Sequence, residues 1–127
     1  MGAPTMYVPG VCNIGKAEIS RRSQAGWIGA GITAAAWITF YFAHVQAPWR
    51  LFLFVPAALS ASGFLQAVMH FCAGFGNRGV FNFGPEVGKT DTVAQAEFRK
   101  KDKRKAQQIL RLSALIGVVM AVVAYFV

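Results

Sequence analysis

The residues best suited to chemistry in this chain are two cysteines and a histidine beside its apolar segments. Cys12 precedes the first apolar run, while His70 and Cys72 close the second. Thiolates and imidazole bind metal ions, but a closed zinc site needs four such ligands at set spacings. Three cations nearby, Lys16, Arg21 and Arg22, would lower the pKa of a thiol pair and make it reactive. Cys12 and Cys72 are therefore a candidate thiol pair, with inert buried cysteines as the simpler interpretation.

Histidine and glycine patterns raise two cofactor hypotheses, and both conflict with their surroundings. His44 and His70 end successive apolar runs, so an antiparallel hairpin would place them a bilayer apart, too far to share a haem. The segment 74–79 matches G-x-G-x-x-G, but that fingerprint requires a preceding β-strand, and here an apolar run precedes it. We predict no catalytic residues, no metal and no cofactor, and leave open a lipid or pigment held through a partner complex.

Three long apolar runs must position these side chains. They cover about residues 25–45, 51–71 and 109–127, in a chain of 127 residues that is 55% hydrophobic and 14% charged. About 20 apolar residues cross a hydrocarbon core of about 30 Å. The first two runs contain no charged residue, and the third contains only Arg111 near its start. The sequence predicts an all-α membrane protein with an antiparallel helical hairpin and a third transmembrane helix.

The distribution of cations predicts how the helices cross the membrane. Of 13 Lys and Arg residues, all but Arg50 lie before the first run, between the second and third runs, or at Arg111. Loops rich in cations stay cytoplasmic. We expect a bacterial inner membrane protein with a cytoplasmic N-terminus and a periplasmic or extracellular C-terminus. The same clustering argues against nucleic acid as a partner, despite a net charge of +8.

The connecting segments complete a single integral membrane domain over residues 1–127. Residues 1–24 are expected to form a cytoplasmic interfacial segment, and residues 73–108 a cytoplasmic loop and basic helix. The Gly- and Phe-rich part from 74 to 85 is expected to be a tight loop without regular helix. Thr92 and Gln95 fit a capping box, so a helix is predicted from about residue 93 into the third span.

Two sets of residues are candidates for contacts. Cations beside the spans are predicted to contact anionic lipids or a partner: Arg21, Arg22, Arg99, Lys100, Lys101, Lys103, Arg104 and Lys105. Small residues at helical spacing are predicted to pack helices closely, within the chain or against another subunit: Gly26, Ala30, Ala34, Ala57, Ala61, Gly117 and Ala121.

Two segments resemble a known family. Residues 13–22, NIGKAEISRR, resemble the pattern Asn-Val/Ile-Gly-x-x-Asp/Glu-x-x-x-Arg that opens the small two-helix inner-membrane domains often found with rhodanese domains, the YgaP-like transmembrane family. Phe71-Cys72 and Asn82 resemble that family's Phe-Cys and its Gly- and Asn-bearing tail, although Ala73 replaces the usual Pro. The likeness spans about residues 12–84. It implies a cytoplasm-facing hairpin and, where rhodanese is attached, handling of sulfur or thiocyanate.

These observations favour one function and leave two alternatives. The preferred hypothesis is a non-catalytic accessory or structural subunit of a larger bacterial membrane complex, with respiratory and photosynthetic complexes as candidates and other integral membrane subunits as partners. The first alternative is a thiol- or sulfur-related membrane component that uses Cys12 and Cys72. The second is a homo-oligomeric small-molecule channel, for which the spans offer few polar groups.

Overall fold

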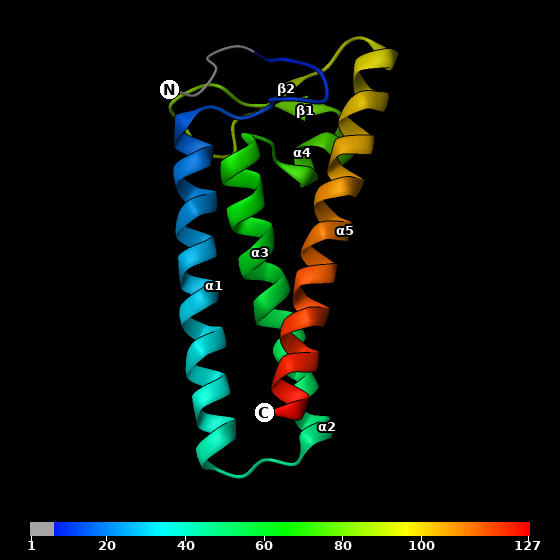
Figure 1. Ribbon diagram of the computed structural model, residues 1–127. Helices are drawn as coiled ribbons and strands as arrows, with labels where there is room; N and C mark the ends of the chain where they lie inside the picture. The colour runs from blue at the N-terminus through cyan, green and yellow to red at the C-terminus, as the bar shows by residue number, and fades with distance from the viewer. Residues whose placement is uncertain (1–6) are drawn as a thin grey trace.

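The computed structural model describes residues 7–127, which form three long helices with short elements at both ends of the bundle (Figure 1). Helix α1 spans Lys16–Phe42, α3 spans Phe54–Met69 and α5 spans Ala96–Phe126. α3 lies between α1 and α5 and runs antiparallel to both. The prediction of a mostly helical chain with three helices long and apolar enough to cross a membrane is confirmed. Residues 1–6 of the predicted interfacial segment lie outside the described residues.

Helix α1 begins nine residues before the predicted span, because the amphipathic stretch ahead of residue 25 forms its first turns. Gly15 is the extended residue at its N-terminus. The helix ends at Phe42, and His44 then adopts a left-handed conformation with φ 55°. Left-handed residues commonly end helices, and histidine tolerates this region better than most side chains.

The second span is continuous but uneven. Helix α2 (Ala47–Arg50) passes through the 3₁₀ turn η1 (Leu51–Leu53) into α3. Pro56 lacks the N–H that would bond back to the carbonyl of residue 52, which explains the local loosening before α3. His70 ends α3 with φ 55°, so both histidines lie at helix ends.

The segment after the second span differs from the predicted loop. Residues Ala73–Arg78 form helix α4, followed by the two-stranded antiparallel pair β1 (Val80–Phe81) and β2 (Asp91–Thr92). The prediction that 74–85 holds no regular helix is wrong over α4. Helix formation is favoured there because Gly76 lets α4 approach α5: a Cβ at this position would lie 2.9 Å from the Asp102 carbonyl oxygen.

The predicted capping box is also wrong. Thr92 belongs to β2, and α5 begins three residues after the predicted start, with Gln95 as an extended N-terminal residue that makes no side-chain capping bond. Pairing with β1 therefore takes precedence over the local capping pattern.

The densest packing lies at the end of the bundle that carries α4 and the β-strands. One buried group joins Phe71 and Ala73 to Ala106 and Ile109 of α5, and a second joins Ile14, Cys72 and Phe75. By contrast, only 11%, 22% and 28% of the apolar windows of the three spans are buried. Soluble chains rarely expose continuous apolar surface of this extent. The lateral faces of the helices therefore require lipid or protein around them.

Candidate functional site

Five polar or sulfur-bearing side chains gather where three parts of the chain meet: residues 7–15, which we call the lead segment, α1, and the residues after α3. We call Asn13, Glu18, Arg22, Cys72 and Asn82 the polar cap cluster. All except Arg22, which is half-buried, are buried. Every one of them lies in the two segments that carry the family resemblance. The structure therefore brings together residues from positions 13–22 and 72–82 that are far apart in the chain.

Asn13 joins the lead segment to the end of the second span. Its side-chain Oδ1 accepts from the backbone N–H of Cys72 at 2.6 Å, and its Nδ2 donates to the Cys72 carbonyl at 3.1 Å. Its backbone N–H donates to the His70 carbonyl at 3.1 Å, and its carbonyl accepts from the Asn82 N–H at 3.0 Å. An asparagine side chain can accept from a backbone N–H and donate to a backbone carbonyl at the same time. The Asn13 side chain therefore pairs with the Cys72 backbone as a neighbouring β-strand would.

Glu18 is the buried charge of this cluster. Its carboxylate forms an ion pair with Arg22 at 2.8 Å, one helical turn away. It also accepts from the side-chain amide of Asn82 at 3.0 Å and from the backbone N–H of Gly88 at 2.6 Å. A buried carboxylate without partners is costly, so all three donors stabilise Glu18. Two of them, Asn82 and Gly88, hold α1 against the 82–88 segment.

Arg22 does not take the role predicted for it. It was expected to contact lipid or a partner, but its guanidinium turns inward to Glu18, donates to Cys72 Sγ at 3.0 Å and lies 5.6 Å from the centre of the Phe75 ring. Arg21, its neighbour, is exposed. Helical geometry explains the difference, because Arg22 is four residues from Glu18 and therefore on the same face.

The two cysteines are both free and buried, and their environments differ. Cys12 donates weakly to the Ile14 carbonyl at 3.5 Å, and burial raises the pKa of its thiol. This shift is opposite to the lowering predicted from nearby cations, because burial is the largest influence on the Cys12 thiol. Cys72 is the thiol with a cation beside it. Within residues 7–127 no group of three metal-ligating side chains is close enough to hold an ion.

The two histidines and the G-x-G-x-x-G segment lie at helix ends and helix contacts. His44 and His70 end helices at opposite ends of the bundle (Figure 1). In the G-x-G-x-x-G segment, Gly76 permits contact with α5, and Gly79, with φ 69°, ends α4. A β-strand follows this segment instead of preceding it, which is the reverse of the order in a dinucleotide site.

A second buried carboxylate lies on α5. Asp102 has no exposed surface and accepts from the Gly10 backbone N–H at 2.8 Å and from the Tyr7 hydroxyl. Burial, followed by the bond and charge of Asp102, raises the pKa of the Tyr7 phenol. The lead segment is therefore hydrogen-bonded to α5 as well as to the residues that end α3 and precede α4.

The small residues meet along two helix contacts. A Cβ at Gly63 of α3 would lie 2.7 Å from the Gly26 backbone nitrogen of α1, so the two backbones approach closely. A Cβ at Gly117 of α5 would lie 2.8 Å from Ala58 Cβ of α3. Of the predicted packing residues, five are buried in the chain's own helices: Gly26, Ala57, Ala61, Gly117 and Ala121.

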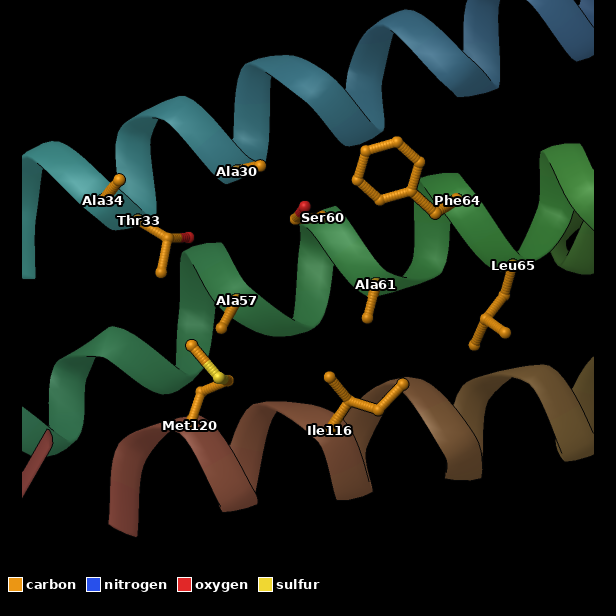
Figure 2. Close-up of a pocket in the computed structure, with 10 residues that line it drawn as sticks. All are labelled: Ala30, Thr33, Ala34, Ala57, Ser60, Ala61, Phe64, Leu65, Ile116 and Met120. Atoms are coloured by element: carbon orange, nitrogen blue, oxygen red, sulfur yellow. The ribbon is translucent and has the colours of Figure 1, made fainter. Parts of the chain in front are cut away.

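An apolar groove of about 410 Å³ lies over the centre of the bundle (Figure 2). Its floor is α3, and its sides are α1 and α5. Ala30 and Ala34, the other two predicted packing residues, lie on the α1 side. The lining is dominated by small and apolar side chains: Ala30, Thr33, Ala34, Ala57, Ser60, Ala61, Phe64, Leu65, Ile116 and Met120. The groove therefore admits an elongated apolar body close to the helix backbones.

The hydroxyl groups in the groove point into the bundle. Thr33 donates to the Gly29 carbonyl at 2.7 Å, and Ser60 donates across the helix contact to the Gly26 carbonyl at 2.7 Å. These bonds leave few polar groups for a passing solute.

The basic residues of α5 have distinct surroundings. Arg99 donates to the carbonyls of Val93 and Ala94 and closes the turn before α5. Lys101, Arg104 and Lys105 line a hollow together with the lead segment. Lys100 and Lys103 are exposed.

Sequence reasoning missed the two buried carboxylates. Glu18 had a signal, because it stands four residues before Arg22 in a chain with only five acidic residues. Asp102 had a weaker one, as the single anion among the cations of 99–105. Asn13 and Asn82 were noted for the resemblance alone, and their bonding could not be foreseen without the fold.

Comparisons with known protein families, with curated proteins and with solved structures find no match to this chain.

Proposed function

We propose that this protein is a non-catalytic accessory or structural subunit of a larger bacterial membrane complex, and that the groove receives a transmembrane helix of another subunit. The observation that supports this is the groove itself. Alanines from α1 and α3 line it, and small side chains allow helix backbones to approach closely in a membrane. The side chains of the polar cap cluster form hydrogen bonds with one another and with nearby backbone groups. They therefore suit a role in holding the helices together.

The proposed setting is the inner membrane, with the polar cap cluster on the cytoplasmic side. The cation distribution supports this orientation. Respiratory and photosynthetic complexes are the candidate hosts, because they contain many small helical subunits.

Two neighbouring alanines provide a matched test. Ala34 lines the groove and Ala35 does not, yet both are exposed, so Ala34→Phe and Ala35→Phe change the protein equally in composition. Tagged protein is purified from its native membrane in mild detergent, and co-purifying subunits are quantified by mass spectrometry. We expect Ala34→Phe to reduce their recovery about tenfold, from a steric cost of about 1–3 kcal/mol. Ala35→Phe should leave recovery unchanged.

Two outcomes contradict the proposal. Unmodified protein that migrates alone at monomer size, with no co-purifying subunit, removes the accessory role. Equal recovery with both variants removes the groove as the contact surface while leaving the accessory role intact.

One observation favours the thiol-related alternative. The Arg22 guanidinium donates to Cys72 Sγ at 3.0 Å, so a cation contacts one of the two thiols directly. If this thiol chemistry is the function, Cys12→Ser/Cys72→Ser should abolish the phenotype of the gene. Full function of the double variant, with normal membrane levels, rejects this alternative.

A further inference from the structure

We propose that the hollow between the lead segment and α5 binds the phosphate of an anionic phospholipid. The hollow has a volume of about 330 Å³ and three cationic side chains in its wall. Its lining consists of Pro9, Gly10, Lys101, Arg104, Lys105 and Gln108. This site is separate from the groove and does not depend on the proposed accessory role.

The positive charge of this hollow is not neutralised by a neighbouring acid. Within residues 7–127 the ion pairs are Arg22–Glu18 and Lys89–Glu86, and neither involves a cation of the hollow. Asp102 is adjacent in sequence, but its carboxylate is buried and occupied by Tyr7 and Gly10. Asp102 faces away from Arg104, two residues later, but lies on the same helix face as Lys105, three residues later. Its bonds to Tyr7 and Gly10, and not its direction, keep its carboxylate from pairing with the hollow's cations.

The wall opposite the cations is rigidly placed. Gly10 has φ 70°, and its N–H donates to Asp102 at 2.8 Å. A Cβ at Gly10 would lie 3.2 Å from Lys101 Cβ, so the turn is in close contact with the helix. A fixed wall distinguishes this hollow from the exposed cations Lys100 and Lys103, which attract anions without forming a pocket.

The hollow lies at the height of lipid headgroups. Gln108, its deepest helical residue, directly precedes the apolar run that starts at Ile109, and Lys105 is about one turn earlier. The headgroup zone extends roughly 5–7 Å beyond the hydrocarbon core. A phosphate beside Lys105, which is about 6 Å beyond Ile109 along the helix axis, would therefore lie where phospholipids carry theirs.

The surface below the hollow suits acyl chains, which selects a lipid over a free phosphate. Lys105, Leu112 and Val119 follow one another at intervals of seven residues, about two helical turns, so they lie on the same side of α5 and outside the lining of the groove. This side of α5 remains partly or fully exposed. One phospholipid can therefore place its phosphate among the cations and its tails along the helix.

Lipid retention in neutral detergent tests this proposal, because no charged membrane surface then contributes to binding. The full chain is incubated with phosphatidylglycerol or phosphatidylcholine, and bound lipid is counted by native mass spectrometry. We compare Arg104→Gln/Lys105→Gln, which alters the hollow, with Lys100→Gln/Lys103→Gln, which removes the same charge outside it. Loss of a charged hydrogen bond should weaken phosphatidylglycerol retention at least about tenfold in the first variant. The second variant should bind like the unmodified protein.

Several results would overturn the site. Equal losses in both double variants would indicate diffuse attraction, and no loss in either would place the lipid elsewhere. Equal retention of phosphatidylcholine would show that the tails alone bind. Displacement of lipid by millimolar inorganic phosphate would identify a free phosphate as occupant, and release of a co-purifying subunit without lipid loss would identify an acidic partner. Arg104→Gln, a single exposed change, provides a second variant if the double variant does not fold.

Discussion

At the scale of residues, the carboxylates are of two kinds, buried and exposed. Glu18 and Asp102 are buried and bonded to several donors, whereas Glu86 forms an exposed pair with Lys89. Removing one partner of a buried pair leaves an uncompensated charge, while an exposed pair contributes little. The buried carboxylates are therefore expected to determine whether the end of the bundle that carries α4 and the β-strands keeps its structure.

Glu18→Ala should lower the free energy of unfolding by about 3 kcal/mol or more, because Arg22 is left half-buried without its partner. Unfolding by denaturant in detergent, followed by circular dichroism, measures the loss. Glu86→Ala is the matched control and should cost under about 1 kcal/mol. Similar small losses in both variants would show that the Glu18 pair is not stabilising.

The Cys12 thiol predicts how stability changes at alkaline pH. Burial raises its pKa in the folded protein above the ordinary value of 9.0. Between these two pKa values the unfolded chain has lost a proton that the folded chain keeps, so stability is full below pH 9.0 and falls as pH rises above it. Thermal unfolding between neutral and alkaline pH should show this fall. In Cys12→Ala the fall should be shallower, and an unchanged slope would contradict the assignment.

At the scale of elements, glycine controls how closely the helices approach. Gly63→Ala should destabilise the protein by about 1–3 kcal/mol, because the added Cβ would meet the backbone of α1 within 2.8 Å. Gly31→Ala on α1 is the control, since a Cβ there has open space around it and alanine favours helix. Melting temperatures in detergent compare the two. A stable Gly63→Ala variant would mean that α1 and α3 are not in backbone contact.

The elements also show what sequence could and could not predict. The three spans followed from apolar length, because a bilayer sets that length. α4 was missed because glycine-rich segments resist helix formation in isolation, and here contact of Gly76 with α5 outweighs that preference. The start of α5 was misplaced because Thr92 pairs with Val80, a partner distant in sequence. Of the candidate site, sequence reasoning identified Cys72 and the proximity of Arg22 to it, but not the bonds from Asn13 or the ion pair of Arg22 with Glu18.

At the scale of the whole molecule, the cation distribution and the fold predict one orientation. Single cysteines introduced at Gln46 and Lys89, both exposed, lie near opposite ends of the bundle. In a Cys12→Ser/Cys72→Ser background, a membrane-impermeant maleimide should label Gln46→Cys in intact spheroplasts. It should label Lys89→Cys only after lysis. The reverse pattern would invert the proposed topology and place the phospholipid site in the outer leaflet of that membrane.

The hydrogen bonds from Tyr7 and Gly10 to Asp102 affect the order in which the helices and the lead segment can assemble during synthesis. These bonds join residues 95 and 92 positions apart, so a segment made before α1 waits for a residue of α5. The hairpin of α1 and α3 can assemble as soon as both helices have been made. The lead segment acquires its final neighbours only when α5 arrives. Closure of this end of the bundle therefore reports that α5 has been synthesised, and chains truncated before α5 would expose an unfinished lead segment to proteases.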